Sequence, residues 1–350
     1  MTNERDISDR VASLSRRKFV AGAGVLAVGG AGATVALTAD DAGTDRFLAR
    51  QGMLRYEVTP LGDGETTVET FYDYRGTDAH PPEGLVADPD TSRLFLYHGP
   101  VSDSLVFLHG SADAEHGGTA DFELSGLSRE RGEWAVRDDP RSVADDFERW
   151  DEGNARVVWE WGAGDTDGGA FWGGFDRQDF EVSVTPKAFS GVDSWRLLTG
   201  EATDPTRHGL VMDRPCYLRP ARDRSVERAN VEVMPDTDPN EFDPYAEERL
   251  TVAVNPPPAD ADADEWVDPA SLDPGNYSLY FGSKPALARG EGAQPQNYRR
   301  VDGSLELEYV ARAAGFDLES AHGYLAGKAA EKTFVRGRDT VRPGGFDNSE

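Results

Sequence analysis

Two aspartates in a glycine-rich segment form the most distinctive chemical pattern of the 350-residue sequence. Asp165 and Asp167 lie between two aromatic runs that contain Trp161 and Trp172. Carboxylates in such a turn can hold a hard cation such as Ca²⁺ through oxygen ligands. The two indole rings could stack on a sugar. The simpler interpretation is a loop whose aspartates cap their own backbone and whose glycines adopt positive φ.

Histidines supply a second candidate metal site. His98 and His109 end neighbouring apolar runs, and a hairpin turn between the runs would place both at one end of a sheet, with His116 further along. Imidazoles and a carboxylate can bind Zn²⁺. The alternative is that these histidines are separate surface or loop residues. A third set has the residue types of a blue-copper site in the reverse of the usual order: His208, Met212 and Cys216.

Motifs of common catalytic sites are missing from the sequence. It contains no G-x-S-x-G, no H-E-x-x-H, no P-loop and no G-x-G-x-x-G after a strand. Because Cys216 is the single cysteine, an intramolecular disulfide and an all-cysteine metal site are excluded. Glycoside hydrolysis needs two carboxylates, and the 64 acidic residues offer so many that no pair can be singled out.

The charge of the chain indicates the solvent for which it is built. It has 64 Asp and Glu against 36 Lys and Arg, a net charge of −28. This charge argues against binding of nucleic-acid phosphates and against attraction to an anionic membrane surface. In molar salt the Debye length falls to about 3 Å, so the repulsion between carboxylates is screened. The composition resembles that of proteins from salt-loving archaea and predicts a fold that requires high salt.

The N-terminus carries the strongest motif. Ser15 is followed by Arg16, Arg17, Lys18 and Phe19, and then by an uncharged run rich in Gly, Ala and Val that extends to residue 39. This order of charged and apolar segments resembles a twin-arginine signal peptide. The resemblance implies export of the folded chain by the twin-arginine translocation machinery, to the cell surface or the outside. The apolar run is also long enough to anchor the protein in the membrane if it is not cleaved.

The rest of the chain predicts a mainly β fold. Short runs alternate between apolar and polar residues, which places apolar side chains on one face of a sheet. Their spacing and the absence of a long amphipathic helix favour an antiparallel β-sandwich. The expected strands include 54–58, 67–71, 93–97, 104–108, 121–124, 133–136, 156–161 and 180–184.

The same patterns divide the chain into parts. We expect a signal peptide or anchor at 1–39, an acidic tether at 40–52, a β-sandwich domain at 53–220 and a second β-rich region at 221–350. The second region contains an acidic loop at 256–275 and a C-terminal helix at 317–332. Asp317 can cap this helix, and Glu319 in its first turn favours the helix dipole.

These observations favour an exported binding or structural protein over an enzyme. Apart from the export motif, the mature part resembles the exported β-rich proteins of halophilic archaea only in composition. No cofactor is predicted apart from the candidate Ca²⁺ at Asp165 and Asp167. The alternative is an exported hydrolase that acts on polysaccharide through Asp and Glu.

Overall fold

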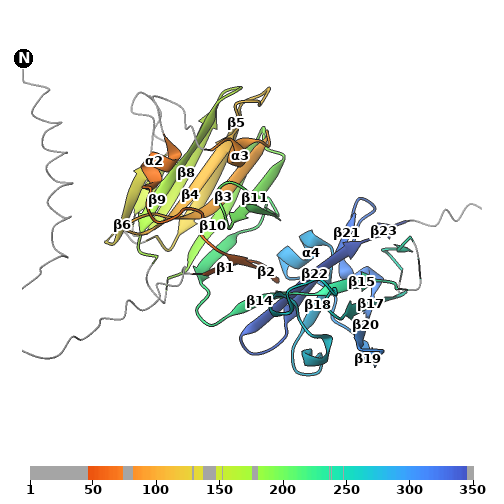
Figure 1. The fold of residues 1–350 in the computed structure, drawn as a ribbon. Coiled ribbons are helices and arrows are strands. Elements are labelled where there is room, and N and C mark those ends of the chain that lie inside the picture. Colours follow the sequence, from red (N-terminus) through yellow and green to blue (C-terminus); the bar gives the residue numbers. More distant parts are fainter. Residues whose placement is uncertain are drawn as a thin grey trace, which may run out of the picture. The chain divides into compact units, whose positions relative to one another are not determined.

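A computed structural model describes residues 46–73, 82–127, 130–136, 147–151, 153–175, 180–235, 237, 239–246 and 248–344. The described residues are mainly β-strands (Figure 1), which confirms the predicted mainly β fold. Their longest helix, α4 (Lys284–Arg289), has six residues. No described helix is long and apolar enough to cross a membrane. The export motif with Arg16, Arg17 and Phe19 lies outside the described residues.

Two large sheets form the first part of the described chain. In sheet order, the seven-stranded sheet contains β2 (Leu54–Val58), β1 (Phe47–Gln51), β13 (Cys216–Pro220), β10 (Val182–Ser190), β5 (Gly118–Ser125), β8 (Asn154–Trp161) and β7 (Phe147–Asp151). The six-stranded sheet contains β12 (Thr206–Leu210), β11 (Ser194–Thr199), β3 (Thr91–His98), β4 (Asp103–Gly110), β9 (Thr166–Gly173) and β6 (Gly132–Val136). Strand β1 begins at Phe47, so the predicted tether is wrong beyond residue 46.

The six-stranded sheet is buried on both faces. Leu94 and Leu96 on one face of β3 share a core with residues of the seven-stranded sheet. On the other face, Phe95 and Tyr97 pack with residues of α2 (Val68–Tyr72) and α3 (Glu83–Val86), which explains why β3 is apolar at consecutive positions. β3 runs parallel to β11 and antiparallel to β4, so the sheet is mixed.

One of the expected strands is a helix. Residues 67–71 alternate in polarity, but the structure has helix α2 at Val68–Tyr72. The Thr67 side chain accepts a hydrogen bond from the backbone N–H of Thr70, and Asp73 ends the helix in the left-handed conformation. Capping at both ends thus overrides a short alternation that is compatible with either structure.

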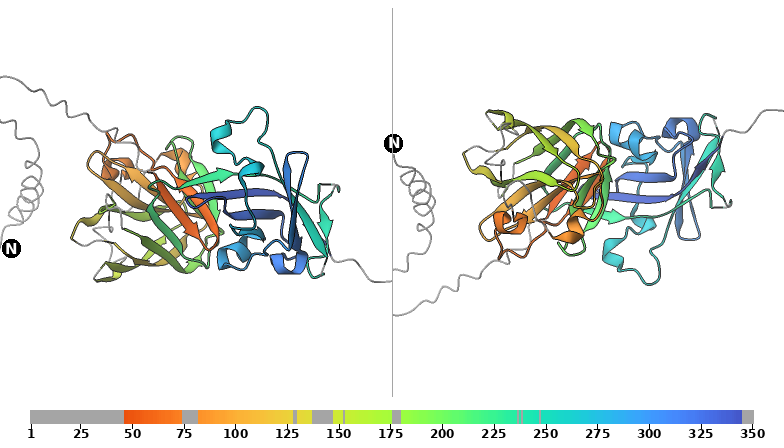
Figure 2. Two further views of the ribbon diagram at one scale, coloured as in Figure 1. Left: turned by 90° about the horizontal axis from the view of Figure 1, so that it is seen from below. Right: turned by 90° about the horizontal axis from the view of Figure 1, so that it is seen from above.

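Two four-stranded sheets and a small two-stranded sheet form the remainder, coloured green to blue in Figure 2. The first contains β14 (Ser225–Arg228), β22 (Thr333–Thr340), β21 (His322–Lys328) and β18 (Leu279–Gly282). The second contains β15 (Asn230–Val233), β17 (Arg249–Asn255), β20 (Ser304–Val310) and β19 (Asn297–Val301). β16 (Glu241–Phe242) pairs with β23 (Arg342–Pro343). The two four-stranded sheets share one core, in which the ring centres of Phe281 and Tyr309 are 5.3 Å apart.

The predicted C-terminal helix at 317–332 is wrong. Asp317 accepts hydrogen bonds from the Glu319 N–H and the Ser320 hydroxyl in a local turn, and the chain then enters β21. Gly323 and Gly327 explain the difference, because glycine disfavours a helix interior. In the sheet, a Cβ on Gly327 would lie 2.3 Å from the carbonyl oxygen of Ser278, so glycine permits this close approach.

Candidate functional site

A cavity of about 510 Å³ is lined by basic and aromatic side chains from both groups of sheets. We call it the basic pocket. Its lining residues are Leu54, Tyr56, Thr206, Arg207, His208, Gly209, Arg228, Ala229, Trp266, Lys284, Tyr324, Leu325, Arg336, Gly337 and Arg338. None of these residues is acidic, although acidic residues outnumber basic ones by 64 to 36 in the chain.

Strand register brings the arginines of the basic pocket together. Arg336 and Arg338 are two positions apart in β22, so both lie on the same face of the sheet. Arg228 of β14 lies opposite Arg336 in the parallel pair, and Tyr324 of β21 lies opposite Arg338 in the antiparallel pair. Lys284 joins this face from the first position of α4.

Three cations of the basic pocket lie over aromatic rings. The distances from cation to ring centre are 5.0 Å for Arg336 and Tyr56, 6.0 Å for Arg228 and Trp266, and 6.0 Å for Lys284 and Tyr324. Such cation–π contacts contribute about 0.5–2 kcal/mol each. They orient the cations and leave N–H donors available to a ligand.

His208 is a neutral donor in this pocket. Its ring stacks on Tyr56, with ring centres 4.9 Å apart, and its Nδ1 lies 3.4 Å from Nη1 of Arg336. A guanidinium has no acceptor, so Nδ1 accepts the hydrogen bond and the ring proton lies on Nε2. Burial, followed by the charges of Arg336, Lys284 and Arg228, lowers the pKa of His208 to about 3. At neutral pH the imidazole therefore offers an Nε2–H donor.

Three charges of the basic pocket are not compensated. Lys284, Arg336 and Arg338 form no ion pair with a carboxylate of the described residues. Burial, followed by Arg338 and Arg336, lowers the pKa of Lys284 to about 8. Burial also lowers the pKa of Arg336. Arg228 pairs with Glu265 at 3.3 Å, but both side chains are more than half exposed, and such surface pairs contribute little.

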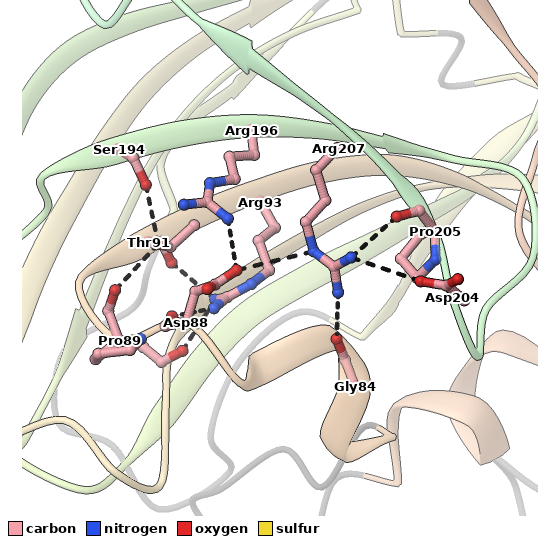
Figure 3. A network of polar contacts seen from close by, with 11 residues as sticks. Gly84, Asp88, Pro89, Thr91, Arg93, Ser194, Arg196, Asp204, Pro205 and Arg207 are labelled. Atoms are coloured by element: carbon pink, nitrogen blue, oxygen red, sulfur yellow. Dashed lines mark hydrogen bonds and ion pairs between the residues drawn. The ribbon is translucent and has the colours of Figure 1, made fainter.

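A second arginine cluster surrounds a carboxylate, that of Asp88. Figure 3 shows Arg93, Arg196 and Arg207 around Asp88. Arg196 Nη1 is 2.5 Å from the Asp88 carboxylate, and Arg207 Nε is 3.8 Å from it. Arg207 also donates to the carbonyl of Gly84 at 2.8 Å, so its guanidinium is already engaged although it lines the basic pocket. Asp88 thus pairs with two of the three arginines, and backbone carbonyls hold Arg93. The basic pocket has no such carboxylate among its lining residues.

The predicted calcium site is not brought together with other ligands. Asp167 accepts hydrogen bonds from the backbone N–H groups of Glu160 at 3.1 Å and Gly168 at 2.7 Å, the contacts of a backbone-capping aspartate. Asp165 lies in the turn between β8 and β9. Within the described residues, no group of three or more His, Cys, Asp or Glu could hold a metal ion. Ca²⁺ at this pair stays an untested prediction.

The two candidate stacking residues lie far apart. Trp161 ends β8 and is 6% exposed, with its ring stacked on His109 at 5.3 Å. Trp172 lies near the far end of β9, about 20 Å along the strand from its start. It lines a different cavity, of about 560 Å³, together with His98, Asp103 and Arg131. One sugar ring therefore cannot stack on both indoles.

The candidate histidine site at one end of the hairpin is not formed, because His98 and His109 lie at opposite ends of it. The β3–β4 hairpin exists, but His98 lies at its turn, opposite Asp103, with Nδ1 2.8 Å from the carboxylate. His109 lies at the other end of β4, opposite Ser92, and is fully buried. The residues of the candidate copper site are separated as well. His208 lies in the six-stranded sheet and Cys216 lies in the seven-stranded sheet. Burial raises the pKa of the Cys216 thiol to about 12.

Neither cavity has the carboxylate pair of a glycoside hydrolase among its described lining residues. The cavity at Trp172 has Asp103 alone, and the basic pocket has none. Such an enzyme needs two carboxylates about 5–10 Å apart. The hydrolase alternative therefore gains no support from these two cavities.

The sequence analysis did not predict the basic pocket, because it considered the Lys and Arg residues only in the net charge and not in their positions along the chain. One local signal was available. Residues 328–342 contain five basic and two acidic side chains, which is unusual in a chain of net charge −28.

Comparison with known proteins found no protein-family model and no curated sequence that matches this chain.

Proposed function

We propose that this β-sandwich protein is exported by the twin-arginine route and binds a small anionic molecule in its basic pocket, at the cell surface or outside the cell. The export part of the proposal rests on Arg16, Arg17, Phe19 and the apolar run that follows. The binding part rests on the uncompensated cations of the pocket.

The single observation that carries the proposal is that Lys284, Arg336 and Arg338 gather without a carboxylate. Like charges in a partly buried site repel one another and lose hydration, which destabilises the fold. A nearby Asp or Glu would relieve this cost, and the chain has 64 such residues. An anionic ligand is the partner that would supply the missing charge.

The location of the cations also suits binding in brine. Exposed charges interact weakly in concentrated salt, whereas partly buried pairs are screened much less. Arg336 and Lys284 are partly buried, so short charge-assisted hydrogen bonds to an anion would persist at high ionic strength.

Replacing Lys284 with methionine is expected to weaken anion binding by about 10- to 100-fold, because a hydrogen bond to a charged group contributes about 1.5–3 kcal/mol. Isothermal titration calorimetry with inorganic phosphate and with glucose 6-phosphate, in concentrated salt, measures this change. Lys187→Met is the matched control, since Lys187 is exposed, pairs with Glu123 at 3.5 Å and does not line the basic pocket. The proposal is wrong if the wild type binds neither probe or if both variants change affinity equally.

The affinity for sulfate is expected to fall as pH rises above about 8, by up to about tenfold per pH unit. Sulfate keeps its charge in this range, whereas Lys284, with a pKa of about 8, loses its proton. His208 is already neutral there, since its pKa is about 3. Titration of sulfate between pH 7 and pH 10 measures the effect. Lys284→Arg should flatten the profile, and an unchanged profile would rule out Lys284 as the titrating group.

A further inference from the structure

We infer that the basic pocket holds two anion subsites and that its ligand carries two phosphate or sulfate groups on one compact polar skeleton. This inference rests on the proposed function. It is carried by the count of uncompensated charges, by their placement along β22 and by the size of the cavity.

The inner subsite is formed by Arg336, Lys284 and His208. Arg336 and His208 are in contact at 3.4 Å, and the imidazole is left with its Nε2–H donor. The ammonium of Lys284 lies beside Gly209, where an added Cβ would be 2.9 Å from Nζ. Two cations and a neutral donor that line the same part of a cavity are the chemistry that binds the oxygens of one tetrahedral anion.

The outer subsite is centred on Arg338. It lies two residues beyond Arg336 on the same face of β22, a rise of about 7 Å. Its side chain is exposed and forms no hydrogen bond or ion pair with the described residues. Arg228 of the neighbouring strand β14 is already paired with Glu265. Arg338 is therefore the cation that is free to bind a second group at the rim.

Charge and volume both exceed what one anion can satisfy. A phosphate monoester carries about −1.5 to −2 charges at neutral pH, whereas Lys284, Arg336 and Arg338 together carry three positive charges. The cavity of about 510 Å³ lies in the range of sites for whole small molecules, about 300–1,000 Å³. One inorganic ion would leave both charge and space unfilled.

The skeleton between the two groups is polar instead of aromatic. Arg336 and His208 both contact the ring of Tyr56, and a cation lies 6.0 Å from the ring centres of Tyr324 and Trp266, which reduces the aromatic surface open to a planar ligand. Thr206, which also lines the pocket, and the backbone of β12 offer hydrogen-bonding groups. A sugar that carries two anionic groups has this chemistry.

Two probes that differ by one phosphate test the inference: glucose 6-phosphate and glucose 1,6-bisphosphate, titrated by calorimetry in concentrated salt. The wild type is expected to bind the bisphosphate at least about tenfold more tightly. Arg338→Met should remove this gain and leave the monophosphate affinity within about twofold. Lys284→Met should weaken both ligands.

Arg249→Met is the control for loss of charge, because Arg249 lies on the surface of β17, with its side chain 63% exposed. It should change neither affinity, and circular dichroism checks that each variant is folded. Equal affinities for the two probes in the wild type, or equal weakening of both by Arg338→Met, would overturn the two-subsite inference and leave the proposed function standing. Failure of both sugar phosphates and of inorganic phosphate to bind would overturn both.

Discussion

Replacing Arg93 with methionine is expected to lower the free energy of unfolding by about 3 kcal/mol or more, because three backbone carbonyls lose a buried donor. Arg93 is 1% exposed, and its Nη1 donates to the carbonyls of Thr91 at 2.8 Å and Gly110 at 3.0 Å. Its Nη2 donates to the carbonyl of Asp88 (Figure 3). Methionine can fill much of the volume, but it leaves three carbonyls without this donor. Each unsatisfied buried group costs about 1–3 kcal/mol.

Urea unfolding in concentrated salt measures the effect, with Arg249→Met as the control. Arg249 pairs with Glu308 at 2.8 Å, but its side chain is exposed, so its removal should cost at most about 1 kcal/mol. Arg93→Lys should fall between the two variants, because it keeps the charge and loses the planar fork of donors. A loss for Arg93→Met no larger than that of the control would show that the Arg93 hydrogen bonds do not exceed the cost of burying its charge.

The strands that the sequence predicted correctly are those in which burial alone sets the pattern. Residues 54–58 alternate because one face of β2 meets the core, and the structure has the strand at Leu54–Val58. Residues 156–161 alternate for the same reason in β8. The failures occur where capping or close backbone approach decides the structure, as in α2 with its Thr67 cap and in β21 with its two glycines.

The basic pocket could not be predicted from local patterns. Its central residues, Tyr56, His208, Lys284 and Arg336, come from four segments that are distant in the sequence. Only strand register and the approach of the two groups of sheets bring them together. The sequence shows Arg336 and Arg338 two positions apart, but two basic residues at this spacing are equally typical of an exposed strand face.

Trp161 shows the opposite error, because this side chain was a candidate ligand contact in the sequence and belongs to the core of the structure. Trp159 and Trp161 both point into the space between the two large sheets, where they enclose His109. The ring centres are 4.9 Å and 5.3 Å from that of the imidazole. His109 was a candidate metal ligand in the sequence, and here it is a buried titratable group.

His109 is expected to make the fold sensitive to acid. Burial, followed by the charge of Arg93, lowers its pKa from 6.5 to about 3. Between these values the unfolded chain binds a proton that the folded chain does not, so the free energy of unfolding falls as pH decreases from 6.5. The slope for one histidine approaches about 1.4 kcal/mol per pH unit. His208 has the same depressed pKa and should add a similar slope.

His109→Phe is therefore expected to reduce the slope between pH 6.5 and pH 5 by about half. Both ring nitrogens of His109 lack a hydrogen-bond partner among the described residues, so phenylalanine should also raise the stability at pH 8 by about 1–3 kcal/mol. Urea unfolding at a series of pH values measures both effects. The slope is the decisive quantity, because a packing defect in the variant would shift all pH values equally.

His116→Gln is the control, since His116 is exposed and should leave the slope unchanged. If wild type and His109→Phe have the same slope, His109 gains its proton in the folded state. The aromatic enclosure would then admit water or an acceptor at mildly acidic pH, since a charged imidazole is not stable among Trp159, Trp161 and Phe122 alone. A halved slope would instead show that the enclosure stays dry and that acid unfolds the protein by charging this side chain.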